Sequence, residues 1–196
     1  MCIRDRIKGE LFQKIGNDKD ARLMFKEINQ DSDFYLDAQI NLALNYSFYL
    51  SYDEAIKNIN KLLEKNNNLY PIKKILADTH RIEKNYKFAI QLYNEMIERN
   101  ENDLWSIYYL RGICFERLGQ WDKAEKNFLK SLDLKPDSPN VLNYLAYGWV
   151  ERNIRLDQSL EMLKAAYDAN PESSYIIDSL AWAYFKKNNY NEAAKL

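Results

Sequence analysis

The sequence predicts an all-α fold in which antiparallel helix pairs stack in a row to form a solenoid. The first observation is a pattern of small and bulky side chains that recurs about every 34 residues. The second is that the 196 residues include only 5 glycines and 4 prolines, fewer than sheets joined by many tight turns need. The third is the supply of bulky side chains, with 15 Tyr, 8 Phe and 4 Trp.

The pattern begins in residues 7–35 and continues through residues 36–69 and 70–104. Each copy has a small residue in its first helix with a ring three residues later, and a small residue in its second helix with a bulky one four residues later. These positions are Gly9, Phe12, Ala21 and Phe25, then Ala43, Tyr46, Ala55 and Ile59, then Ala77, His80, Ala89 and Tyr93. Spacings of three and four place such residues on one face of a helix.

Three further copies occupy residues 105–138, 139–173 and 174–196, of which the first is the clearest and the last is incomplete. Their matching positions are Gly112, Phe115, Ala124 and Phe128, then Ala146, Trp149, Ser159 and Leu163, then Ala181, Tyr184 and Ala193. The small residues of all six second helices follow one another at steps of 34 or 35 residues. Six copies in register predict helix pairs that bury their apolar faces only by stacking on their neighbours.

Turn chemistry supports the same boundaries. Gly or Asn stands between the two helices of four copies, where a left-handed residue ends a helix. These residues are Gly16, Gly119, Asn153 and Asn188. Pro136 and Pro171 follow second helices and are expected to stop them. Ser138 is expected to cap the next helix, with Pro139 in its first turn.

This pattern closely resembles the tetratricopeptide repeat over residues 7–196. The resemblance implies a right-handed superhelical solenoid in a single array, with approximate repeats at 7–35, 36–69, 70–104, 105–138, 139–173 and 174–196. In this family the first helix of each pair lines a concave groove. The groove residues that the resemblance assigns here are Ile40, Leu44, Lys74, Asp78, Arg81, Tyr109, Ile113, Asn143, Tyr147, Asp178 and Trp182.

The resemblance implies a scaffold or adaptor that binds a partner protein or peptide in the groove and performs no catalysis. Tyr, Trp and Arg are common anchors at binding surfaces. Some family members clamp chaperone tails with paired Lys and Asn, but most matching positions here are Tyr, Ile, Asp or Trp, which argues against that ligand. One alternative is that the chain is the targeting arm of a larger enzyme. Another is end-to-end stacking into an oligomer.

Charge and motif content point to no other chemistry. The formal net charge is −1, which gives no electrostatic case for a nucleic-acid partner. No run approaches the ~20 apolar residues of a membrane span. His80 is the only histidine and stands in an aromatic packing slot, and no glycine-rich phosphate loop occurs. We therefore expect no catalytic residue, no cofactor and no metal, and we expect Cys114 to be a buried thiol.

Both ends of the sequence show unusual features. Residues 1–6, Met1-Cys2-Ile3-Arg4-Asp5-Arg6, resemble the translation of a sequencing adapter, so the natural sequence is expected to begin near Ile7. The helix-forming run at 192–196 stops abruptly, which favours an internal fragment. The segments 143–147, 155–160 and 175–182 resemble paired repeats of bacterial cell-envelope proteins, some of them lipoprotein adaptors for proteases. That resemblance implies that the protein is located in the periplasm or associated with the outer membrane, with the cytoplasm as the alternative location.

Overall fold

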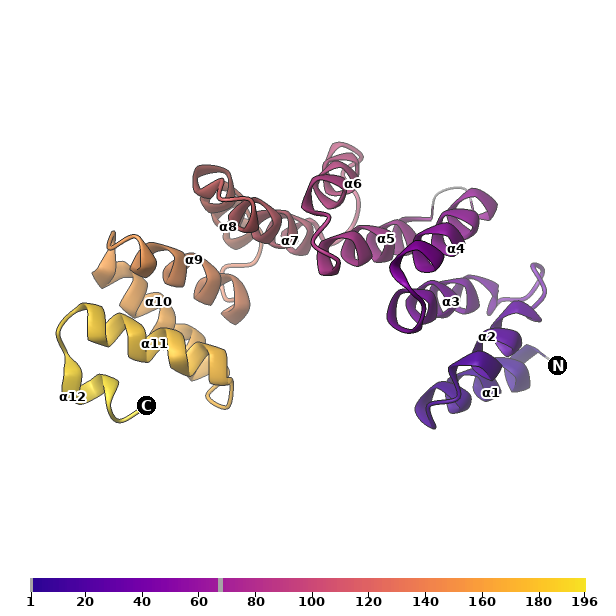
Figure 1. Cartoon of the computed structure of the whole chain (residues 1–196), viewed down its shortest axis with the longest axis horizontal. Coiled ribbons are helices and arrows are strands. Elements are labelled where there is room, and N and C mark those ends of the chain that lie inside the picture. Colours follow the sequence, from indigo (N-terminus) through magenta and orange to yellow (C-terminus); the bar gives the residue numbers. More distant parts are fainter. Residues whose placement is uncertain (1, 67–68) are drawn as a thin grey trace. The chain divides into compact units, whose positions relative to one another are not determined.

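The computed structural model describes residues 2–66 and 69–196, and those residues form helices joined by short turns, with no β-strand among them (Figure 1). Met1 of the segment 1–6, and Asn67 and Asn68 of the second predicted copy, lie outside the described residues. Contacts divide the chain into two compact units, residues 1–99 and 100–196. The predicted all-α fold of packed helix pairs is confirmed.

The N-terminal unit contains three helix pairs. Its helices are α1 (Cys2–Lys14), α2 (Asp18–Lys26), α3 (Tyr35–Tyr49), α4 (Tyr52–Lys65), α5 (Tyr70–Ile82) and α6 (Tyr86–Glu98). Within each pair the two helices contact each other, and α3 also packs on α2 and α5. Ser47 of α3 and Thr79 of α5 share a hydrogen bond of 2.8 Å between their hydroxyl groups.

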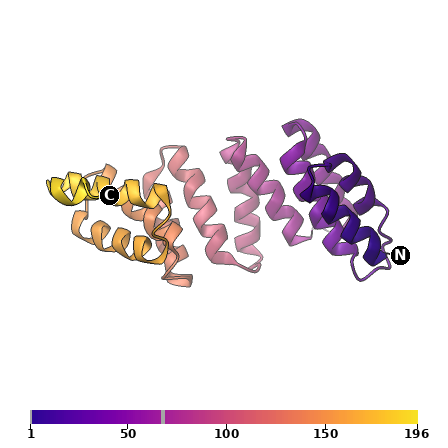
Figure 2. The same ribbon diagram turned by 90° about the horizontal axis from the view of Figure 1, so that it is seen from below.

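The C-terminal unit repeats this arrangement. Its helices are α7 (Leu104–Arg117), α8 (Trp121–Leu134), α9 (Pro139–Glu151), α10 (Leu156–Ala169), α11 (Ser174–Lys186) and the short α12 (Tyr190–Ala193). The helix α9 contacts α8, α10 and α11, so first helices of successive pairs lie side by side. Figure 2 shows neighbouring helices of each unit running alongside one another.

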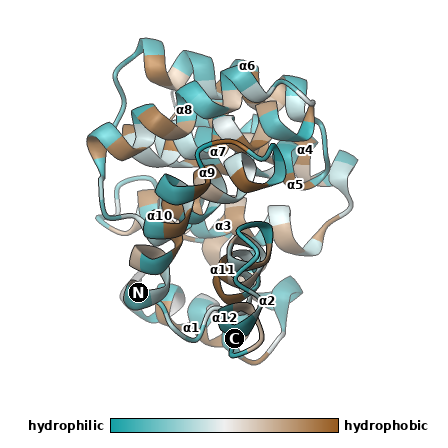
Figure 3. Ribbon diagram, turned by 90° about the vertical axis from the view of Figure 1, so that its left-hand side faces the viewer, coloured by the Kyte–Doolittle hydropathy of each residue, from teal (hydrophilic) through white to brown (hydrophobic). Residues whose placement is uncertain are grey.

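Helices of both units bury one face and expose the other. Figure 3 shows the ribbons alternating between hydrophobic and hydrophilic stretches along individual helices. The predicted small residues of the second helices are buried in the first five copies, whereas Ala193 in α12 is only half-buried. Trp149 is fully buried, and its indole N–H donates a 2.7 Å hydrogen bond to Glu125 Oε1. Burial of a large ring with its polar atom satisfied favours this packing.

Close approach explains why glycine replaces alanine in some first helices. A Cβ atom on Gly9 would lie 2.6 Å from the ring of Phe25, the bulky residue of its own second helix. A Cβ atom on Gly148 would collide with the Trp121 ring of α8. The absence of a side chain at these positions lets a ring rest directly on the helix backbone. Gly9 is the small residue of its copy in the repeat pattern, whereas the contact of Gly148 was not predicted.

The left-handed turn residues are confirmed. The backbone φ angles are +77° at Gly16, +71° at Gly119, +56° at Asn153 and +60° at Asn188. Lys84 occupies the same turn slot of the third copy and has a φ of +63°, which the sequence did not signal. A lysine adopts this conformation at a cost, because its Cβ crowds the following carbonyl oxygen.

The helix ends around Ser138 are partly as predicted. The helix α8 ends at Leu134, before Pro136, and α10 ends at Ala169, before Pro171. Pro139 lies in the first turn of α9. Ser138 occupies the N-cap position, as predicted, although its side chain makes no capping hydrogen bond. Proline at the start of α9 lacks an N–H, which lowers the number of donors that a cap must satisfy.

Candidate functional site

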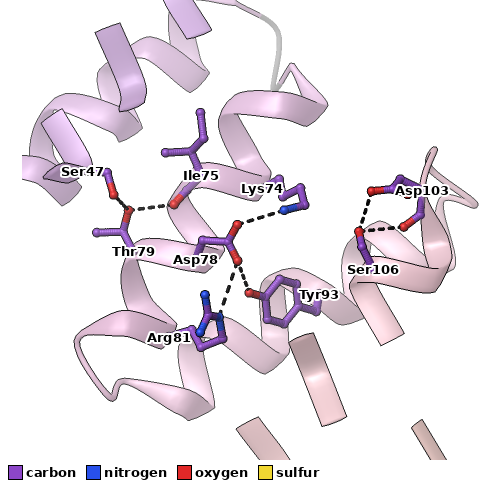
Figure 4. Close-up of polar contacts among 9 residues, drawn as sticks. All are labelled: Ser47, Lys74, Ile75, Asp78, Thr79, Arg81, Tyr93, Asp103 and Ser106. Carbon is purple, nitrogen blue, oxygen red and sulfur yellow. Dashed lines mark hydrogen bonds and ion pairs between the residues drawn. The ribbon is translucent and has the colours of Figure 1, made fainter. Parts of the chain in front are cut away.

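Lys74, Asp78 and Arg81, three of the predicted groove residues, lie together on α5 of the N-terminal unit (Figure 4). The carboxylate of Asp78 is 3.0 Å from Lys74 Nζ and 3.6 Å from Arg81 Nε. It also accepts a 2.6 Å hydrogen bond from the hydroxyl group of Tyr93 in α6. We call these four residues the Asp78 cluster. Its carboxylate is surrounded by partners from the same helix pair, so it holds α5 and α6 together.

The C-terminal unit carries a groove of about 470 Å³ on its first helices. The side chains that line it come from α7, α9 and α11, and we call it the aromatic groove. The lining residues are Arg117, Asn143, Tyr144, Tyr147, Tyr175, Asp178, Ser179 and Trp182. Side chains from three successive first helices therefore meet at one surface, although they are up to 65 positions apart in the sequence (117 to 182).

The structure brings together four of the predicted residues in this groove: Asn143, Tyr147, Asp178 and Trp182. Two other predicted residues of this unit lie elsewhere. Ile113 is buried in the core, and the ring of Tyr109 meets the edge of the Tyr144 ring with 5.5 Å between centroids.

Four groove residues were missed by sequence reasoning. They are Arg117, Tyr144, Tyr175 and Ser179. Helical spacing offered a signal for two of them, because Tyr175 precedes Asp178 by three positions and Arg117 follows Ile113 by four. Tyr144 lies beside Asn143 in the sequence, and only the folded structure shows that both side chains line the groove.

Several aromatic side chains of the groove are held in place by neighbours. The indole N–H of Trp182 donates a 2.6 Å hydrogen bond to Glu151 Oε1, and the Trp182 ring stacks on Phe185 with 5.2 Å between centroids. The hydroxyl group of Tyr175 donates a 2.7 Å hydrogen bond to Asn140 Oδ1. Side chains fixed in this way lose little conformational entropy when a ligand binds.

Two polar groups of the groove have no partner among the described residues. The side-chain oxygen of Asn143 is buried and accepts no hydrogen bond. The carboxylate of Asp178 is exposed and takes part in no ion pair or hydrogen bond in this part of the chain. A buried acceptor without a donor costs free energy, so a ligand that supplies a donor gains that energy on binding.

Tyr147 borders a second hollow of about 580 Å³, whose lining includes Glu116, Glu151 and Arg152. Burial raises the pKa of Tyr147, and the charges of Glu151 and Glu116 raise that pKa further. The Tyr147 hydroxyl group therefore keeps its proton well above neutral pH. It can donate a hydrogen bond to a ligand or accept one from it.

His80 packs as the predicted aromatic residue. Its imidazole is buried, stacks on Phe88 with 5.5 Å between centroids, and shares a 2.9 Å hydrogen bond with the Tyr52 hydroxyl group. Burial lowers the pKa of His80. Within residues 2–66 and 69–196 no group of three or more His, Cys, Asp or Glu side chains could hold a metal ion. None of the helices described has the length and hydropathy to cross a membrane.

Comparison with known proteins identifies the repeat. The family model of the tetratricopeptide repeat matches residues 105–138, the same residues as the clearest copy in the sequence. The chain carries a tetratricopeptide repeat at residues 105–138. Proteins with tetratricopeptide repeats are generally non-catalytic scaffolds that bind other proteins.

Relatives and a solved structure extend the similarity beyond one repeat. The chain is 30% identical over 109 residues to the BBSome complex member BBS4 of Bos taurus, covering 55% of the chain and 20% of that protein. It is 24% identical over 145 residues to the TPR repeat-containing protein PA4667 of Pseudomonas aeruginosa, covering 73% of the chain and 24% of that protein. The chain thus spans about a fifth to a quarter of the curated relatives it matches.

The crystal structure of a tetratricopeptide repeat protein from Parabacteroides merdae superimposes with a TM-score of 0.73. The match covers 99% of this chain and 76% of that one, at 19% sequence identity. Similarity at this identity supports the helical repeat fold, whereas the chemistry of any site must be argued from the residues of this chain itself.

Proposed function

We propose that this protein is a scaffold that holds a segment of a partner protein in the aromatic groove. The observation that carries the proposal is the unfilled hydrogen-bonding capacity inside a groove lined by fixed aromatic side chains. Asn143 presents a buried oxygen without a donor, and Tyr147 and Trp182 stand beside it in the lining. Peptide segments offer both backbone N–H donors and apolar side chains, which such a groove can accept.

The relatives support a role in assembly. The bovine relative is named as a member of a complex. The four groove residues that the sequence predicted come from the first helices α9 and α11, the helices that the family uses to line its concave face. Binding through such a surface needs no cofactor, and the buried surface of one extended segment is enough for reversible association.

The experiment is a selection of short peptides from a random library on the purified wild-type protein. We expect enriched sequences to bind the wild type and to lose at least about tenfold in affinity with the double variant Tyr147→Ala, Trp182→Ala, because truncation of central aromatic anchors typically costs 2 kcal/mol or more. Circular dichroism should show equal helicity for both proteins.

The matched control removes two exposed rings that do not line the groove, Phe48 and Tyr49 of α3. The variant Phe48→Ala, Tyr49→Ala should bind the selected peptides as the wild type does. If both double variants bind equally well, or if the control loses affinity and the groove variant does not, the aromatic groove is not the binding site.

A second candidate function is that of a targeting arm in a larger enzyme. Its support is that the curated relatives are four to five times longer than the matched region. The intact gene tests it directly, since a catalytic domain in the same reading frame would favour this function. In that case the aromatic groove would still bind the protein to which the enzyme is directed.

A further inference from the structure

The charges around the aromatic groove are unevenly paired. Asp178 of α11 lines the groove, is exposed, and has no ion pair or hydrogen bond within the described residues. A carboxylate in this situation is exposed to water and keeps its hydrogen-bonding capacity open. It offers an attractive partner to any cation that enters the groove.

A second carboxylate next to the groove also lacks a cation. Glu151 at the end of α9 is exposed and accepts the hydrogen bond of the Trp182 indole, and no cation of the described residues forms an ion pair with it. Both carboxylates therefore lie near the Trp182 ring. Glu151 accepts the 2.6 Å hydrogen bond of its indole N–H, and Asp178 precedes Trp182 by one turn of α11.

The two arginine side chains of this region already interact with other groups. The Arg117 guanidinium pairs with Glu116, with 3.4 Å between Nε and Oε2. The Arg152 guanidinium lies 3.9 Å from the centroid of the Trp121 ring and donates a 2.9 Å hydrogen bond to the Gly148 carbonyl oxygen. The carboxylates of Asp178 and Glu151 therefore remain without a cationic partner from these two arginines.

Other groups of the groove also suit a donor that carries positive charge. The buried side-chain oxygen of Asn143 accepts no hydrogen bond. An ammonium or guanidinium group carries several N–H donors, so it can bind a carboxylate and donate to this oxygen as well. Aromatic faces attract cations, and Lys186 Nζ already lies 4.9 Å from the centroid of the Trp182 ring. Burial raises the pKa of Tyr147, and the negative charges of Glu151 and Glu116, which line the neighbouring hollow, raise that pKa further.

We propose that the aromatic groove selects a partner segment carrying a lysine or arginine side chain, whose charged group binds Asp178 and the Asn143 side-chain oxygen. The inference rests on the proposed function and adds the chemical class of the ligand. The aliphatic part of the basic side chain packs against Tyr147 and Tyr175, while its charged end reaches the two acceptors.

The test uses labelled libraries of short peptides with random flanking positions and one fixed central residue, which is Lys, Arg, Leu or Glu. We expect the Lys and Arg libraries to bind the wild type about fivefold more tightly than the Glu library. A difference in affinity of this size is the largest that one exposed ion pair usually produces. Raising the ionic strength should reduce that preference because salt screens exposed charges.

Three variants locate the preference. Asp178→Asn should remove most of the difference between the Lys and Glu libraries, and Asp178→Glu should keep it. The matched control is Asp133→Asn on α8, which deletes the same charge from an exposed site outside the groove and should change nothing. Asp178 is exposed, so its replacement should leave the helicity unchanged.

The outcomes separate the two proposals. Peptide binding that depends on Tyr147 and Trp182 but shows no preference for Lys and Arg would overturn the basic-ligand inference and leave the scaffold function standing. A preference that persists in Asp178→Asn would overturn it too. If no library binds the wild type more tightly than the variant Tyr147→Ala, Trp182→Ala, both proposals fail.

Discussion

Gly112 in α7 lies so close to Phe128 in α8 that a Cβ atom on the glycine would stand 2.7 Å from the ring. The same relationship, sixteen positions apart, holds between Gly9 and Phe25 in the N-terminal unit, at 2.6 Å. The two pairs show that the repeat pattern encodes contact between a bare helix backbone and an aromatic ring. Neither partner can change size alone without disturbing the helix pair.

Gly112→Ala should therefore destabilise the protein although alanine is the better helix former. The clash with Phe128 costs about 1–3 kcal/mol, which outweighs a propensity gain of about 1 kcal/mol. Chemical denaturation of the single variants and of the double variant Gly112→Ala, Phe128→Leu measures the coupling. The smaller leucine side chain should relieve the strain, so strictly additive effects of the two substitutions would contradict the contact.

Ala124→Leu should destabilise the protein for a related reason. Ala124 is fully buried where α8 meets its neighbours, and a larger side chain there overpacks the core at a cost of about 1–3 kcal/mol. The matched control is Ala165→Leu in α10, an exposed position that has room for the added atoms. Equal melting temperatures for wild type and Ala124→Leu would be inconsistent with this packing.

Lys84→Gly should stabilise the protein, unlike most substitutions by glycine. Lys84 has a φ of +63°, a conformation that costs an L-residue about 1–2 kcal/mol and costs glycine nothing. Greater freedom of the unfolded chain offsets part of the gain, which leaves about 0.5 kcal/mol. Urea denaturation measures it. The reciprocal change Gly119→Ala, at a φ of +71°, should destabilise by about 1 kcal/mol.

His80 should make stability depend on pH in the weakly acidic range. Burial holds its pKa in the folded state below the value of about 6.5 in the unfolded chain. As the pH falls below about 6.5, the unfolded chain binds a proton that the folded chain resists, so the free energy of unfolding decreases.

Thermal melts at neutral pH and at about pH 5 measure this effect. His80→Phe places the aromatic ring of other copies in the same slot, so this variant should lose less stability between the two pH values than the wild type. Carboxylates titrate in both proteins and cancel in the comparison. An identical loss in the two proteins would show that His80 does not contribute.

The candidate site was only partly predictable from sequence. Helical spacing placed Asn143, Tyr147, Asp178 and Trp182 on first-helix faces, and all four line the aromatic groove. The same reasoning also placed Ile113 in the groove, although its side chain is buried. Helical periodicity alone does not distinguish a position that faces the groove from one that the next helix covers. The partner-binding role of these residues, and the single array over residues 7–196, remain predictions.

The Asp78 cluster illustrates another limit. Sequence spacing placed Lys74, Asp78 and Arg81 on one face of a helix, but it did not show that the Tyr93 hydroxyl group of the next helix donates to the same carboxylate. This bond joins α5 and α6 and depends on how the two helices pack. A carboxylate with partners on several sides contributes to holding the pair together, which side-chain spacing in one helix cannot reveal.

The sequence by itself determined the helix pairs, their order and the positions where small residues meet bulky ones. These features follow from local periodicity and turn chemistry, which act over a few residues and repeat in every copy. Only the tertiary structure decided which side chains meet in the aromatic groove, that Asp178 and the Asn143 oxygen are left unpartnered there, and that Lys84 adopts a left-handed turn. Those outcomes depend on how closely separate helices approach one another, and a one-dimensional pattern does not specify that distance.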